Sequence, residues 1–164
     1  MKFYSNDILP SWYDAYVEGF SVLIRHLDVS SVVEIGVRTG YGAQLFHNLW
    51  PYALYQGFDK EQESAGEHEF GRERVWEIDG EYTVLDTQTV DDLGVTADFV
   101  HIDAAHTAEG TEHDLELAVK TGARWVFVDD LDNPDVLVGV RNSGLRFDFI
   151  PIAGTPRVVG RIAL

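Results

Sequence analysis

Hydrophobic positions along the chain form short runs rich in β-branched residues, separated by longer stretches with helical spacing. A short apolar run that ends near Gly or Asp is typical of a strand buried inside a parallel sheet. These runs predict strands at residues 31–36, 54–58, 82–85, 98–102, 124–128, 145–152 and 157–163. A brief Gly- and Pro-containing segment joins the last two strands, which indicates an antiparallel hairpin.

Helical spacing is clearest near the start of the chain. Between residues 13 and 27, apolar side chains recur at i, i+3, i+4 and i+7, and Ser11 is a candidate N-cap. The same reasoning predicts helices at residues 40–50, 89–93, 109–120 and 134–141. Residues 60–80 are mostly polar, and we expect a short helix and a mobile loop there.

Strands that alternate with helices predict parallel βαβ units, hence an α/β fold with an open sheet and helices on both faces. No repeat or composition break divides the 164 residues. We therefore expect one domain over residues 1–164, with a helical segment at residues 1–30 packing on the sheet.

Charge and composition narrow the choice of partners. The formal net charge is −16, which disfavours nucleic acid and anionic membranes as partners, although it could serve solubility alone. The chain has no cysteine, which excludes disulfides and thiolate catalysis. It also lacks a long apolar run and a signal-peptide pattern, so we expect a cytoplasmic protein.

Residues that follow the strands are the candidates for chemistry, since ligands of open α/β sheets bind outside the carboxyl ends of the strands. The first predicted strand leads into Glu34-x-Gly36-x-x-x-Gly40, and the second ends in Asp59. A glycine turn followed by an acidic residue that can bind ribose hydroxyls points to a nucleoside-bearing cofactor. Glu34 suits an amine-bearing ligand such as S-adenosylmethionine (SAM) better than the pyrophosphate of NAD, whereas a glycine turn alone could be purely structural.

The later strand ends are also polar. Asp86 and Thr87 could read an adenine edge or cap a helix. Asp103 follows the fourth strand, while Asp129 and Asp130 follow the fifth, and neighbouring parallel strands would place these carboxylates side by side. Clustered carboxylates suit Mg²⁺ or a similar hard cation; alternatively, Asp129 bonds locally and no metal binds.

These residues match a known family. The chain resembles the class I SAM-dependent methyltransferases, most of all the branch of macrocin-type O-methyltransferases and cephalosporin hydroxylase-like proteins. The resemblance is carried by residues 33–40, 57–59, 99–106 with Asp114, and 128–130. It departs from the wider family at Arg38, where many members have a central Gly.

The resemblance implies a three-layer Rossmann-like methyltransferase fold with a mostly parallel seven-stranded sheet and a C-terminal antiparallel hairpin. It also implies a cofactor site, a metal site and a catalytic pair. The expected SAM contacts are Glu34, Gly36, Arg38, Gly40, Asp59, Asp86, Thr87 and Asp103. The expected Mg²⁺ ligands are Asp103, Asp129 and Asp130, and the expected catalytic residues are His106, as general base, and Asp103.

The expected reaction is metal-assisted methylation of a small-molecule acceptor such as a sugar, nucleoside or polyphenol. Trp12, Tyr13 and Trp76 could line the acceptor site or simply pack. We expect His47, His68 and His113 to be solvated. A homodimer could form through the hairpin edge or the N-terminal helix.

Three other functions remain open. One is an NAD-dependent oxidoreductase, although the Gly-x-Gly-x-x-Gly turn typical of NAD-binding folds is missing. Another is a SAM-binding module without acceptor chemistry. The last is a metal-independent methyltransferase acting on nitrogen or a carboxylate.

Overall fold

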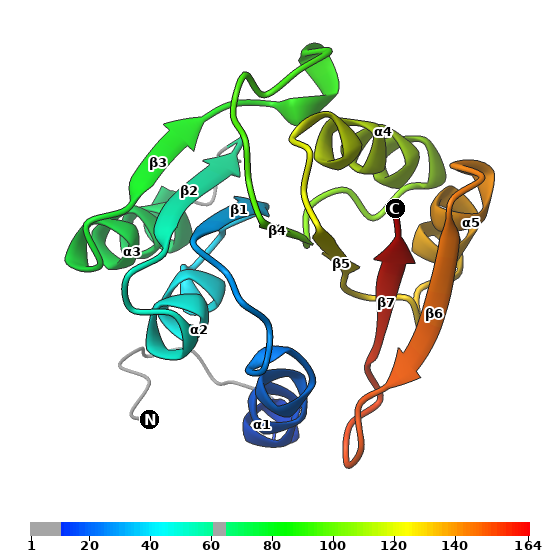
Figure 1. Cartoon of the computed structure of the whole chain (residues 1–164), viewed down its shortest axis with the longest axis horizontal. Coiled ribbons are helices and arrows are strands. Elements are labelled where there is room, and N and C mark those ends of the chain that lie inside the picture. Colours follow the sequence, from blue (N-terminus) through cyan, green and yellow to red (C-terminus); the bar gives the residue numbers. More distant parts are fainter. Residues whose placement is uncertain (1–10, 61–64) are drawn as a thin grey trace.

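The structure, a computed structural model, describes residues 11–60 and 65–164 of the chain. A seven-stranded sheet runs through its middle, in the order β3-β2-β1-β4-β5-β7-β6 (Figure 1). The strands are β1 (Ser31–Ile35), β2 (Leu54–Asp59), β3 (Glu81–Val84), β4 (Phe99–Ile102), β5 (Trp125–Val128), β6 (Arg146–Pro151) and β7 (Val158–Ala163). The first five are parallel, and β7 is antiparallel to both β5 and β6. The predicted mixed sheet and its terminal hairpin are confirmed.

Helices cover both faces of this sheet (Figure 1). They are α1 (Tyr13–Ile24), α2 (Tyr41–Leu49), α3 (Ala65–Glu77), α4 (Ala108–Lys120) and α5 (Pro134–Asn142), with one 3₁₀ turn, η1 (Thr87–Thr89). Buried residues of α1, α2 and α3 share one hydrophobic core, and those of α4 and α5 share the other. Within the described residues, none of the helices combines the length and the apolar character needed to cross a bilayer.

The strand order places the site. The chain turns from β1 to β2 on one side and to β4 on the other, so the carboxyl ends of β1 and β4 lie next to each other at the point where the order reverses. In register, Glu34 of β1 stands beside His101 of β4. Such a switch point leaves a crevice above the strand ends, where ligands of this fold class bind.

Three sequence expectations about helices are corrected. The helix predicted at residues 89–93 is absent; a 3₁₀ turn occupies Thr87–Thr89, because the Asp86 carboxylate accepts a hydrogen bond from the Gln88 backbone and starts the turn early. Helix α1 begins after Trp12 without a side-chain cap, so Ser11 is not its N-cap. It also ends at Ile24 rather than at residue 27.

The polar stretch at residues 60–80 contains a helix of 13 residues, longer than expected. Tertiary contacts hold it, since Val75 is fully buried and the Arg74 guanidinium bonds the Thr39 carbonyl and lies 4.3 Å from the Tyr41 ring centroid. The mobile loop that we expected there falls in part on residues 61–64, which lie outside the described residues.

Candidate functional site

A left-handed turn connects β1 to α2. Gly36 has φ +91°, Arg38 has φ +46°, and Gly40, with φ +77°, is the N-cap of α2. A Cβ on Gly36 would lie 2.9 Å from the Ala104 Cα and would overlap the Asp103 backbone, so this position requires glycine. The strand ends of β1 and β4 therefore approach each other closely at Gly36.

Asp59 at the end of β2 is tied to this turn. Its Oδ2 accepts a hydrogen bond from the Arg38 backbone N–H at 2.7 Å, and its Oδ1 lies 3.3 Å from Nδ1 of His68 on α3. Both Asp59 and His68 are buried. The expectation that His68 is solvated is therefore wrong, because α3 folds back over the turn and brings this side chain onto the carboxylate.

Two cavities open above the strand ends, with volumes of about 560 and 500 Å³. The larger, the Asp59 cavity, is bordered by Asp59, residues 85–88 and residues 103–106. The smaller, the Trp12 cavity, lies beneath α1. Both are lined by Gly36, Arg38, Asp103 and Arg157, so they adjoin at the β1–β4 switch point. Such volumes suit a nucleoside cofactor and a small acceptor.

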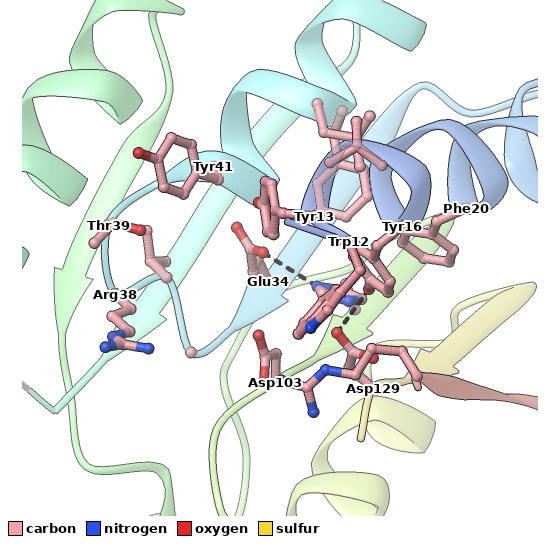
Figure 2. Close-up of a pocket in the computed structure, with 18 residues that line it drawn as sticks. Trp12, Tyr13, Tyr16, Phe20, Glu34, Arg38, Thr39, Tyr41, Asp103 and Asp129 are labelled. Atoms are coloured by element: carbon pink, nitrogen blue, oxygen red, sulfur yellow. Dashed lines mark hydrogen bonds and ion pairs between the residues drawn. The ribbon is translucent and has the colours of Figure 1, made fainter. Parts of the chain in front are cut away.

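Aromatic rings and carboxylates line the Trp12 cavity together, and Asp129 lies beside the Tyr16 ring (Figure 2). The rings belong to Trp12, Tyr13, Tyr16, Phe20, Tyr41 and Phe46, and the carboxylates to Glu34, Asp103 and Asp129. The alternative in which Trp12 and Tyr13 line a ligand site thus agrees with the geometry. Trp76 is 63% exposed and lies outside both cavities.

Glu34 is held in a buried network on the floor of the Trp12 cavity. Its carboxylate accepts a hydrogen bond from the Tyr55 hydroxyl and lies 3.1 Å from Nδ1 of His101. Burial lowers the pKa of His101, but the hydrogen bond and charge of Glu34 outweigh it, and the pKa is raised above its ordinary value. Nε2 of His101 finds no hydrogen-bond partner among the residues that the structure describes.

Asp129 and Asp130 diverge although they are adjacent in sequence. Asp130 has a left-handed backbone, with φ +57°, which turns its side chain away from that of Asp129. Asp129 accepts hydrogen bonds from the Tyr16 hydroxyl at 2.6 Å and from the Asp130 N–H at 2.8 Å. Asp130 instead contacts His106 Nε2 at 2.9 Å and the Arg157 guanidinium.

This divergence changes the candidate metal site. Within the described part of the chain, the group whose ligand atoms lie within 4.8 Å of one another consists of Asp103, His106 and Asp130. Asp129 stands outside this group, contrary to the arrangement expected from the sequence. His106, expected to act as a base, takes its place.

Asp103 lies where the two cavities meet. Although 41% of its side chain is accessible, desolvation by the surrounding protein and the charge of Asp129 raise its pKa to about 7. Burial also raises the pKa of Asp129. Two neighbouring carboxyls with raised pKa values retain their protons more readily than isolated ones or attract a cation, as is common in functional sites.

The raised pKa makes a prediction for Asp103→Asn. In the wild type, the Asp103 carboxyl ionises near pH 4 in the unfolded chain and near pH 7 in the folded protein. Asp103 therefore lowers the free energy of unfolding progressively as the pH rises across that range. Asparagine removes this effect. In metal-free buffer we expect the melting temperature of Asp103→Asn to match that of the wild type near pH 4 and to exceed it increasingly up to about pH 7. An equal difference at both pH values would contradict the assigned pKa.

Asp114 of α4 connects the loop at residues 85–88 to the helix. It is fully buried and accepts hydrogen bonds from the Thr87 hydroxyl at 2.7 Å and the Gln88 amide at 2.9 Å. His113 Nε2 lies 3.0 and 2.9 Å from the carbonyls of Thr87 and Val90, so the expectation that it is solvated is wrong. His47 is half-buried. The Thr87 hydroxyl donates to Asp114, although Thr87 also borders the Asp59 cavity, and Asp86 is a cap, as one of the two sequence alternatives proposed.

Sequence reasoning missed Tyr16, Arg157 and the functional position of His68. Tyr16 reads as one more apolar position of α1, and Arg157 belongs to no recognisable motif. Both reach the site only through tertiary folding. Arg157 is a basic residue in a strongly acidic chain, which is at most a weak sign of a functional role.

Several solved structures with this fold are O-methyltransferases. The TomG O-methyltransferase of Streptomyces achromogenes, involved in tomaymycin synthesis and solved in complex with SAM, matches 96% of this chain and 82% of its own, with TM-score 0.59 and 20% identity. The Bacillus cereus O-methyltransferase in complex with SAH matches 98% of this chain and 84% of its own, with TM-score 0.62 and 15% identity.

A third match is a methyltransferase domain. The methyltransferase domain of bacterial CtHen1-CN matches 94% of this chain and 100% of its own, with TM-score 0.64 and 13% identity. A scan against protein-family models and a search of curated proteins both found no match. The chain therefore has the fold of the class I SAM-dependent methyltransferases.

Proposed function

We propose that the protein is a SAM-dependent methyltransferase that methylates a hydroxyl group of a small acceptor. The observation that carries the proposal is that two cavities meet at Gly36 and Asp103. The Asp59 cavity contains a carboxylate placed to bind ribose hydroxyls, and the Trp12 cavity is lined by aromatic rings. A methyl donor and an acceptor in adjoining cavities would meet at that junction, as transfer of a methyl group requires.

SAM fits the Asp59 cavity in three respects. The Asp59 carboxylate can accept hydrogen bonds from the ribose hydroxyls, and the loop at residues 85–88 offers a wall for adenine. The Asp103 carboxylate borders this cavity and suits the positive sulfonium and ammonium groups, and Glu34 adds a second carboxylate from the adjoining Trp12 cavity. The Arg38 side chain borders both cavities, where it can pair with the methionine carboxylate.

The acceptor would enter the Trp12 cavity. Rings such as Trp12 and Tyr13 can pack against the flat face of a polyphenol, a nucleoside base or a sugar. The acidic chain supports a small-molecule acceptor rather than nucleic acid or an anionic membrane, and the proposal includes a cytoplasmic location.

His106 is the proposed base that removes the hydroxyl proton. It is half-exposed and borders the Asp59 cavity next to Asp103, and Asp130 holds its Nε2 at 2.9 Å. A carboxylate that bonds an imidazole fixes its orientation and stabilises the imidazolium formed when it takes a proton. The Asp103 carboxylate, 3.8 Å from the same nitrogen, can also stabilise the imidazolium.

A divalent cation fits the donor set of Asp103, His106 and Asp130, two carboxylates and one imidazole within 4.8 Å. When bound, Mg²⁺ or Mn²⁺ would lower the pKa of the acceptor hydroxyl and orient it toward the methyl group, and His106 would then be a metal ligand instead of the base. One observation favours the metal-independent alternative, a nitrogen or carboxylate methyltransferase: the Arg157 guanidinium already pairs with Asp130.

The test combines binding and turnover. Calorimetry should show SAM and SAH binding, and a panel containing a catechol, a glycoside, a nucleoside and an amine should reveal methyl transfer from labelled SAM. Loss of activity with EDTA and recovery with Mg²⁺ or Mn²⁺ would support metal assistance, whereas unchanged activity would favour the metal-independent reaction. Cofactor binding without turnover on the panel would favour a binding module, and no cofactor binding would contradict the proposal.

A further inference from the structure

Arg157 holds together three segments that surround the candidate site. It lies at the end of the β6–β7 connection, and its guanidinium pairs with Asp130 and lies 3.8 Å from Asp132. The guanidinium carbon also lies 5.1 Å from the centroid of the Trp12 ring, within the range of a cation–π contact. The side chain is 30% exposed and borders both cavities.

Asp130 has both carboxylate oxygens in use. Oδ1 accepts from Arg157, and Oδ2 faces His106 at 2.9 Å. The Asp130 side chain is buried, and its backbone has a left-handed conformation. Both features limit the freedom of the carboxylate to turn toward another partner. A cation that uses Asp103, His106 and Asp130 must therefore take an Asp130 oxygen in the immediate vicinity of the guanidinium.

Two cations on one carboxylate repel each other, and the repulsion is strong where protein partly excludes water. We propose that Arg157 and a divalent cation compete for Asp130, so that Arg157 sets the metal affinity of the cluster. Uptake of the cation displaces the guanidinium from Asp130 and from the Trp12 ring, where it borders the acceptor cavity. The inference rests on the proposed function for the role of the cluster, but its test does not depend on turnover.

The hairpin offers a matched control. Arg161 also pairs with an aspartate, Asp148, but both side chains are about half exposed and neither borders the Asp59 or Trp12 cavity. Arg157→Gln and Arg161→Gln therefore each remove one arginine of the same hairpin together with its pairing to aspartate. Only the first pair shares its carboxylate with the cluster.

The experiment is calorimetric titration of the full chain with MnCl₂. We expect Arg157→Gln to bind Mn²⁺ about tenfold or more tightly than the wild type, within the usual 5–150-fold range of coupling between sites. Arg161→Gln should bind like the wild type. In the Arg157→Gln background, Asp130→Asn should remove the gain. Equal or weaker binding by Arg157→Gln would overturn the proposal, as would the absence of Mn²⁺ binding from every variant.

A measurement on the wild type covers the case in which Arg157→Gln does not fold. Addition of Mg²⁺ should shift the side-chain Nε–H NMR signal of Arg157 and leave that of Arg161 in place; an unchanged Arg157 signal at saturating Mg²⁺ would overturn the proposal. SAM titration of the same samples reports separately on the proposed function, because cofactor binding can succeed while the competition fails.

Discussion

Gly36→Val should lower the affinity for SAM by roughly 100-fold or more, which corresponds to about 3 kcal/mol. A left-handed backbone costs a β-branched residue about 1–3 kcal/mol. The added side chain also meets the backbone of Asp103 and Ala104, which cannot rotate away. The ends of β1 and β4 must therefore separate at the junction of the two cavities. Calorimetry with SAM measures the affinity, and urea unfolding measures the accompanying loss of stability.

Gly94→Val is the matched control for this substitution. Gly94 also has a positive φ, +70°, but a Cβ there meets nothing within 4 Å. We expect a loss of about 1–3 kcal/mol of stability from the left-handed backbone, with unchanged SAM affinity. If Gly36→Val bound SAM as tightly as Gly94→Val, the turn after β1 would not contact the cofactor.

Asp59→Ala is expected to weaken SAM binding by roughly 100-fold, because hydrogen bonds to a charged group contribute about 1.5–3 kcal/mol each. The substitution removes the proposed ribose contacts and also the acceptor for the Arg38 N–H, which holds the glycine turn against β2. Asp59→Asn keeps one carbonyl oxygen for Arg38 and should lose less affinity. Calorimetry with SAM and SAH compares the two variants.

An exposed aspartate serves as the control for Asp59. Asp148→Asn removes a carboxylate that pairs with Arg161 on the terminal hairpin, away from both cavities, and should leave SAM binding unchanged. A pattern in which Asp59→Ala and Asp148→Asn bind SAM equally well would show that Asp59 has no role in holding the ribose.

Local sequence patterns predicted the sheet well, and tertiary contacts explain where they failed. The apolar runs of β1, β4 and β5 are buried on both faces, so their signal in the sequence is continuous. Helix α3 lacks a clear apolar stripe, and its stability depends on Val75 and Arg74 meeting α2 and the glycine turn. Such a helix is difficult to predict from spacing alone.

In the candidate site as well, some residues could be predicted from the sequence and others could not. Gly36 and Asp59 were predictable because the fold requires them at fixed places after β1 and β2. The pairing of Asp129 with Tyr16 was not, since adjacent aspartates give no sign that a left-handed residue will turn them apart. Arg157 reaches Asp130 from a hairpin 27 positions along the chain, and no local pattern reports that contact.

A crystal structure with SAH tests the central claim most directly. We expect the ribose hydroxyls on the Asp59 carboxylate, the adenine against residues 85–88, and the homocysteine sulfur at the junction beside Gly36 and Asp103, with the Trp12 cavity left free for an acceptor. Nucleoside density elsewhere, or a sulfur directed away from the Trp12 cavity, would contradict the account.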